Sequence, residues 1–190
     1  MLQNFSERAQ EGAPFELLVA VVVMGFVLLA GFRVIGILQL EECKGRLDSN
    51  LEELKTAIEN VAHGEGQRTV AYTKPSCFPE YNADNPSEGS RLEIIHRTET
   101  RTCSEYCPGA RIECTLLAFT TTDHSNWKCL NISSATDFPS KNDCDDDLLL
   151  GEYEPQQWKK DGILEGQYIL VKKFNEFSQQ PRICAYRRGN

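Results

Sequence analysis

The sequence predicts an α+β protein in which one long N-terminal helix is followed by an antiparallel, β-rich domain that disulfides hold together. Three observations carry this prediction. An apolar run extends from Phe15 to Leu40 and passes into an amphipathic pattern without a Pro or Gly cluster that would end a helix. Beyond Gly66, short segments rich in β-branched and aromatic residues alternate with turn residues. All eight cysteines lie on the C-terminal side of the apolar run.

The N-terminal helix is predicted as one continuous element over residues 14–63, about 75 Å long at ~1.5 Å per residue. Its first half, residues 15–40, is apolar on every side and exceeds the ~20 residues that cross a bilayer. Such a helix is stable in lipid or packed against other apolar helices. In its second half, residues 41–63, Glu52 and Glu59 lie on a face that is expected to be solvated. The opposite face is predicted to be a buried stripe of Cys43, Leu47, Leu51, Leu54, Ile58 and Val61.

Residues 64–190 are predicted to form the β-rich domain, and residues 1–13 form a short polar leader. Runs of β-branched and aromatic residues bounded by turn residues predict the strands of this domain. They are expected at residues 68–73, 91–97, 111–120, 127–132, 167–174 and 183–187. The last two are expected to pair with each other in antiparallel orientation, and the segments between the strands are expected to be loops.

The cysteines predict disulfides rather than a metal site. No C-x-x-C pair occurs, whereas zinc knuckles and covalent haem sites use that spacing. Disulfides persist in oxidising compartments, so the β-rich domain is expected outside the cell. Cys43 is expected to bridge the helix to the globular part, while eight cysteines allow 105 pairings and leave the connectivity open. The predicted disulfide residues are Cys43, Cys77, Cys103, Cys107, Cys114, Cys129, Cys144 and Cys184.

Composition and motifs argue against several classes of function. The net charge of −8 argues against nucleic acid as the main partner, because phosphate binding needs a basic surface. The sequence contains no G-x-S-x-G, H-E-x-x-H, P-loop or G-x-G-x-x-G motif, so neither an enzyme activity nor a cofactor is expected. The acidic segment 142–147 lacks the glycine and closing glutamate of an EF-hand, and no metal is expected there. The triplet Asn131-Ile132-Ser133 makes Asn131 a candidate for N-glycosylation.

The junction between leader and helix reads Arg8-Ala9-Gln10-Glu11-Gly12-Ala13-Pro14-Phe15-Glu16-Leu17-Leu18. With the apolar helix and the disulfide-bearing domain, it resembles the type IV pilin superfamily, in particular archaeal pilin-like and archaellin-like proteins with a class III signal peptide. The resemblance implies that a prepilin peptidase cuts between Ala9 and Gln10. The family commonly has Gly before the cut, and a cut after Gly12 is the alternative.

The resemblance also implies a function. The chain would be a structural subunit of an extracellular filament, a homo-oligomer that lies in the membrane before an assembly machinery moves it. Phe15 and Glu16 would take part in assembly, with Glu16 neutralising the N-terminal amine of a neighbouring subunit or marking the end of the span. The alternative is a single-span, membrane-anchored extracellular binding protein that does not polymerise. Adhesion, motility, DNA uptake and secretion stay open as filament types.

Overall fold

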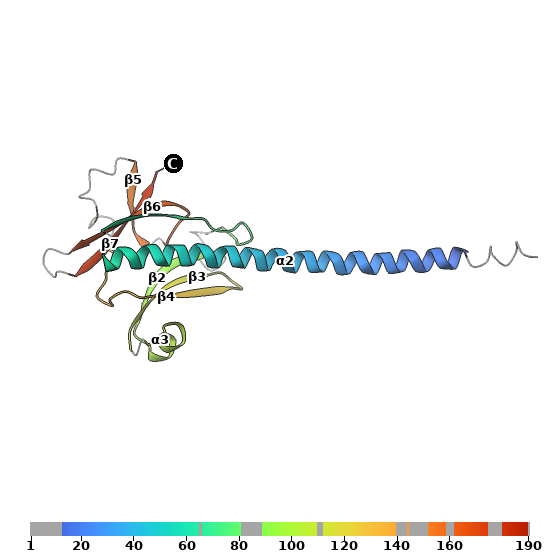
Figure 1. The fold of residues 1–190 in the computed structure, drawn as a ribbon, viewed down its shortest axis with the longest axis horizontal. Coiled ribbons are helices and arrows are strands. Elements are labelled where there is room, and N and C mark those ends of the chain that lie inside the picture. Colours follow the sequence, from blue (N-terminus) through green and yellow to red (C-terminus); the bar gives the residue numbers. More distant parts are fainter. Residues whose placement is uncertain are drawn as a thin grey trace, which may run out of the picture. The chain divides into compact units, whose positions relative to one another are not determined.

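The computed structural model divides into two compact units with the boundary between Lys44 and Gly45. Helix α2 of the first unit continues into the second, and the two β-sheets belong to the second unit (Figure 1). The structure describes residues 13–64, 66–80, 89–109, 112–139, 144, 152–158, 162–174 and 180–189.

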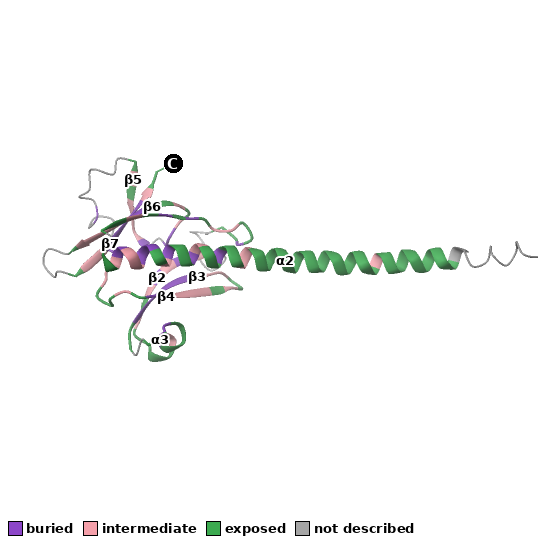
Figure 2. Ribbon diagram, in the orientation of Figure 1, coloured by how far each residue is buried: buried purple, intermediate pink, exposed green. Residues whose placement is uncertain are grey.

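Helix α2 runs without interruption from Ala13 to His63, which confirms the long helix predicted from the sequence. The chain leaves the helix at Gly64, whose backbone N–H donates to the carbonyl of Asn60 at 3.1 Å. In the second unit the helix buries five of the six residues of the predicted stripe completely, whereas Cys43 is only partly buried and residues of the first half are exposed (Figure 2). The completely buried stripe consists of Leu47, Leu51, Leu54, Ile58 and Val61.

The larger sheet is antiparallel, in the order β1-β6-β7-β5. Its strands are β1 at Gln67–Tyr72, β5 at Tyr153–Gln156, β6 at Gly166–Phe174 and β7 at Pro181–Arg188. Strands β6 and β7 form the predicted terminal antiparallel pair. Strand β5 was not predicted, because its four residues include Pro155 and lack β-branched side chains.

The smaller sheet has the order β2-β3-β4 and is also antiparallel. Its strands are β2 at Arg91–Arg97, β3 at Cys114–Thr120 and β4 at Ser125–Leu130. The central strand β3 is buried on both faces over six residues, so its sequence is a nearly continuous hydrophobic run. The predicted strand began at Arg111, which lies outside the described residues.

A short helix, α3 (Thr100–Tyr106), lies where the sequence analysis expected irregular loop from Cys103 onward. Strong local helix signals are absent there, since no side chain caps its N-terminus and the helix has seven residues. Disulfides from Cys103 and Cys107 hold it against the smaller sheet. The prediction failed because tertiary covalent bonds, rather than helix propensity, stabilise this turn of helix.

The second half of α2 contacts both sheets. On one side Lys128 in β4 approaches Asp48 at 2.7 Å, and on the other Lys172 in β6 donates to the carbonyl of Ala62 at 2.6 Å. Side chains alternate along a strand, so Leu117, which is paired with Lys128, shares its helix-facing side. The main core of the domain therefore lies between the sheets, around the buried stripe. Burying one such leucine contributes about 1.5–3 kcal/mol.

Each sheet carries a smaller cluster on the face that points away from α2, and a disulfide lies in each cluster. Cys103, Cys107, Cys114 and Leu116 form the cluster of the smaller sheet. In the larger sheet the cluster consists of Cys144, Ile169, Cys184 and Tyr186. The disulfides thus replace part of the apolar core that a domain of this size lacks on its outer faces.

The cysteines are all oxidised, which confirms the predicted disulfide-stapled domain. The pairs include Cys103–Cys114, Cys107–Cys129 and Cys144–Cys184. Cys43 and Cys77 are disulfide-bonded as well.

Candidate functional site: an uncovered apolar helix

The first half of α2 presents its apolar side chains without cover. Phe15, Phe26 and Phe32 are each 70% exposed, and the exposed aliphatic side chains continue to Leu40. The most apolar 18-residue window has a mean hydropathy of 2.6, and none of it is buried. By length and composition this is the one helix in the described part of the chain that suits a membrane span. Soluble proteins rarely leave so large a continuous apolar surface in contact with water.

The residue types of this segment fit a helix outside water. Valine has only moderate helix propensity in water, yet Val21, Val22 and Val23 follow one another in the middle of the segment. In lipid, a helix satisfies every backbone N–H and C=O internally, so the environment enforces it. A Cβ added at Gly25 or Gly36 would meet no atom within 4 Å. No part of the described chain therefore packs against these two glycines, where another helix could approach the backbone closely.

Charged groups are sparse along the exposed apolar segment. Glu16 lies in the first turn of α2, where a carboxylate interacts favourably with the positive end of the helix dipole. Arg33 is the other ionisable residue of residues 15–40. The water-soluble pattern begins with Glu41 and Lys44, whose side chains form an ion pair at 3.0 Å. The sequence therefore confines charge to two positions of the exposed apolar segment.

Where α2 has entered the domain, a polar cluster joins it to β4. Lys128 lies 2.7 Å from Asp48 and 3.5 Å from Glu52, and Asn126 donates to Asp48 at 3.0 Å. The hydrogen bond from Asn126, followed by that from Lys128, holds the pKa of Asp48 below its usual value. Burial lowers the pKa of Lys128, but its hydrogen bond and charge interaction with Asp48 outweigh this and raise it. The cluster fixes the helix against the edge strand of the smaller sheet.

This cluster corrects one expectation. The face of α2 that carries Glu52 and Glu59 was expected to be plain solvated surface. Instead, Glu52 takes part in the Lys128 cluster, and Glu59 accepts a hydrogen bond from the backbone N–H of Asn131 at 2.7 Å. The sequence pattern that could have indicated this cluster is the spacing of Asp48 and Glu52, which lie four residues apart on the same side of the helix. Their basic partner, Lys128, lies in a strand 76 residues beyond Glu52, and no helix pattern reveals it.

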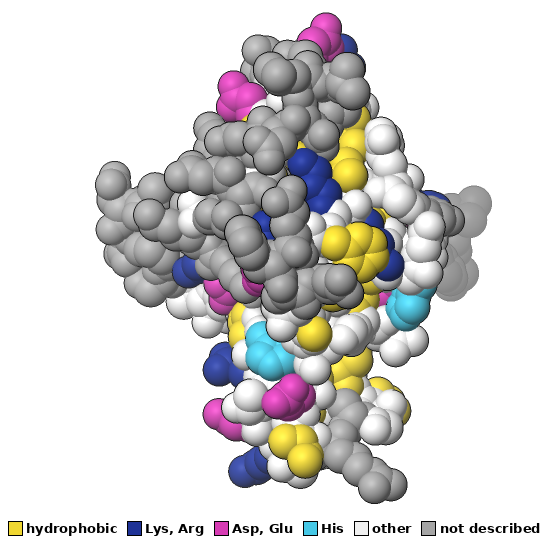
Figure 3. All heavy atoms as spheres, turned by 90° about the vertical axis from the view of Figure 1, so that its left-hand side faces the viewer, with side chains coloured by type: hydrophobic (Ala, Val, Ile, Leu, Met, Phe, Trp, Pro, Cys, Tyr) yellow, Lys and Arg dark blue, Asp and Glu magenta, His cyan; other side chains and the backbone are white. Residues whose placement is uncertain are grey.

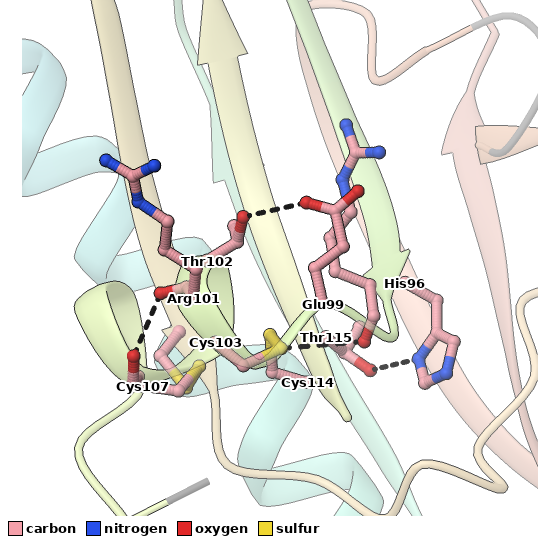
Figure 4. Close-up of a disulfide and its surroundings, with 11 residues drawn as sticks. His96, Glu99, Arg101, Thr102, Cys103, Cys107, Cys114 and Thr115 are labelled. Atoms are coloured by element: carbon pink, nitrogen blue, oxygen red, sulfur yellow. Dashed lines mark hydrogen bonds between the residues drawn. A yellow bond between two sulfur atoms is a disulfide. The ribbon is translucent and has the colours of Figure 1, made fainter. Parts of the chain in front are cut away.

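The cysteines around α3 have a structural arrangement. Cys103 lies in α3 and Cys107 directly follows it, but they bond to different strands, so they do not form a redox pair with each other. Figure 4 shows His96 beside Thr115, with 3.4 Å between its Nδ1 and the hydroxyl oxygen. That histidine contacts no cysteine in this view. The geometry ties a surface helix to β3 and β4.

A cavity of about 320 Å³ opens in the domain beside β1, β2 and β3, lined in part by Tyr72, Leu92, Phe119 and Glu165. Desolvation, with the nearby Glu165 carboxylate, raises the pKa of Tyr72, which therefore stays a neutral phenol. No group of His, Cys, Asp and Glu side chains able to hold a metal occurs among the described residues.

The remaining predicted site residues occupy simple positions. Phe15 and Glu16 are exposed on α2, and Asn131 is exposed directly after β4. Ala9 and Gln10 lie outside the described residues, as does the acidic segment 142–147 apart from Cys144. On the domain face of Figure 3, the visible described side chains mix hydrophobic, acidic and basic types without sorting by kind.

No protein-family model, no curated protein and no solved structure matches this chain. The chain combines an apolar helix that suits a membrane span with a disulfide-rich domain of the kind found outside cells. This architecture is compatible with a filament subunit and with a membrane-anchored extracellular protein.

Proposed function

We propose that this chain is a pilin-like structural subunit of an extracellular, type IV-type filament. The observation that carries the proposal is the uncovered apolar half of α2, which continues directly into the helix that forms the core of the domain. A helix that is apolar all round needs lipid or sister helices around it. In a filament, copies of residues 15–40 would replace the lipid and pack into a central bundle, and the disulfide-stapled domains would coat it.

The proposal assigns roles to the N-terminal residues. A prepilin peptidase removes the leader between Ala9 and Gln10, and Phe15 and Glu16 then lie in the assembly interface. The membrane holds the subunit before assembly, and an assembly machinery extracts it. The role is structural and non-enzymatic, and the main partners are further copies of the chain. A glycan on the exposed Asn131 would face solvent.

A membrane-anchored binding protein that does not polymerise is the second candidate. The cavity beside Tyr72 and Glu165 favours it, because ligand sites are concave and combine apolar side chains such as Leu92 and Phe119 with polar groups that orient the ligand. In this candidate, residues 15–40 stay in lipid as a single span.

The decisive experiment examines cells that make the protein. Filaments sheared from the cell surface are imaged with a label for the β domain, and the N-terminus of the chain in them is read by mass spectrometry. We expect labelled filaments whose subunit begins at Gln10, or at Ala13 for the alternative cut. Replacing Leu28, 54% exposed on the apolar helix, by Lys should abolish the filaments. The exposed Glu53→Lys is the matched control. An intact Met1 chain found in membranes alone contradicts the proposal.

A further inference from the structure

Two opposite charges on the apolar half of α2 have no visible partner. Residues 15–40 contain one acidic side chain, Glu16, and one basic side chain, Arg33. Both are exposed, and neither has an ion-pair partner within the described part of the chain. In lipid or in a dry helix bundle an unpaired charge is unfavourable, and such residues pair with each other. A subunit that assembles through this helix therefore brings one anion and one cation into the interface.

We propose that Glu16 of one copy pairs with Arg33 of another copy, and that this pair sets the axial stagger between neighbouring helices. This inference rests on the proposed filament function. Copies inserted into one membrane share their orientation, so their helices lie parallel. In a parallel pair without stagger, each Glu16 is level with the other Glu16. The two opposite charges become level when one helix is displaced by the 17 residues between them. At ~1.5 Å per residue this displacement is about 25 Å.

The positions of the two residues around the helix also favour an open assembly. At 3.6 residues per turn, 17 residues bring Arg33 to a direction about 100° away from Glu16. Each helix therefore directs Glu16 to one neighbour and Arg33 to a different one. A staggered parallel pair satisfies one Glu16 and one Arg33, and leaves the other two charges to recruit further copies. Such head-to-tail contacts produce helical filaments rather than closed dimers.

Two other arrangements account for the same residues and give different results on mutation. The charges could mark the two ends of a membrane span, since about 25 Å is close to the ~30 Å of a hydrocarbon core. Glu16 could instead neutralise the N-terminal amine of a neighbouring subunit. In both arrangements the effects of changing Glu16 and Arg33 are independent. In the proposed pair they are coupled, and a double reversal compensates.

The first test reverses the charges in the full chain, made in cells that process and assemble it. Sedimentation and electron microscopy of filaments sheared from these cells measure filament formation. Glu16→Lys and Arg33→Glu should each lower the sedimenting fraction about tenfold or more, because like charges then meet in a buried interface. The double variant should return to within about twofold of the unmodified chain. Gln39→Glu adds a single negative charge to the same segment and serves as the control. Neither Glu16→Lys nor Arg33→Glu should restore filament formation to this variant.

The second test measures the stagger directly and leaves both charges in place. Val23→Cys and Leu40→Cys, in separate copies, repeat the spacing of 17 residues, and each lies seven residues beyond Glu16 or Arg33 on nearly the same side of the helix. Made together in one cell and assembled, these copies should form a disulfide-linked dimer under mild oxidation. Ala30→Cys lies on nearly the same side of the helix as position 23 but seven residues, about 10 Å, further along the axis. It should cross-link to position 40 at least about tenfold less, because thiols that far apart cannot bond.

The outcomes separate this inference from the filament function. Filaments that form normally but show equal cross-linking of positions 23 and 30 to position 40 overturn the stagger, as does a double reversal that does not rescue. In either case the filament function stands. An unmodified chain that yields no surface filaments in these cells overturns both.

Discussion

At the scale of single residues, Lys128 shows how a charge contributes to the domain. Its side chain comes from β4 and reaches two carboxylates one turn apart on α2, Asp48 at 2.7 Å and Glu52 at 3.5 Å. The carboxylates are about half exposed, so solvent screens the attraction, and such a pair stabilises a protein by at most about 1 kcal/mol. The hydrogen bonds to Asp48 add geometric specificity, because they fix the rotation of α2 against the sheet.

The lowered pKa of Asp48 predicts that the domain loses stability at acidic pH. Because the folded pKa is depressed, the contribution of Asp48 is present above its usual value of 3.8 and is lost as pH falls through the folded pKa. Asp48→Asn should therefore lower the free energy of unfolding at pH 6, and its difference from the unmodified chain should shrink below about pH 4. Urea unfolding between pH 2 and 6 measures this. Glu53→Gln, exposed on the same helix, is the control, and a difference that stays constant with pH contradicts the prediction.

At the scale of elements, α2 is one helix with two environments. Its first half is exposed along its length, and its second half buries a complete apolar stripe between two sheets. The same residue type therefore has different consequences in the two halves. Leu28 is 54% exposed, whereas Leu54 is fully buried. The stability of the domain depends on the second half, and the first half is free to serve association.

Two matched truncations test this division. Leu54→Ala leaves a cavity in the core and should lower the free energy of unfolding by about 2–5 kcal/mol. Leu28→Ala removes the same atoms from an exposed position and should change it by no more than about 0.5 kcal/mol. Guanidinium unfolding of the full chain in detergent, followed by near-UV circular dichroism of the domain, measures both. Equal losses in the two variants would show that the halves do not differ in this way.

At the scale of the whole molecule, the disulfides compensate for a small core. Cys144–Cys184 closes a separation of 40 residues, and Cys103–Cys114 closes one of 11. In the chain-entropy account, the longer loop restricts the unfolded chain more. The two bonds also lie in the clusters on the outer faces of different sheets. Each sheet is therefore secured on the side that α2 does not cover.

When each disulfide is removed by replacing both of its cysteines with Ser, the loss in the free energy of unfolding should increase with loop length. Loss of Cys144–Cys184 should lower the free energy of unfolding by about 4 kcal/mol, and loss of Cys103–Cys114 by about 3 kcal/mol. Thermal and guanidinium unfolding of the two double variants under non-reducing conditions measure the order. If the variant that lacks the shorter loop is the less stable one, native-state packing around Cys103 outweighs the entropy of the unfolded chain.

The elements that sequence reasoning missed share a physical cause. Strand β5 contains Pro155 and becomes a strand because Ala185, Tyr186, Arg187 and Arg188 of β7 pair with it. Helix α3 forms where two disulfides hold it. In both cases the stabilising partner lies far away in the sequence, and local propensity does not report it. The candidate assembly segment was predictable, because uninterrupted apolarity over residues 15–40 is a local property.

The sequence by itself determined the long helix, its change from apolar to amphipathic, and the β-rich, disulfide-bonded class of the domain. Helical and strand periodicities and the hydropathy of a segment depend on residues that are close in the chain, so they can be recognised in the sequence alone. Only the tertiary structure decided the strand order β1-β6-β7-β5, the partners of Cys103, Cys107 and Cys144, and the contact of Lys128 with Asp48. These features join residues that are distant in the chain, and many pairings are compatible with the same local patterns until the core packs.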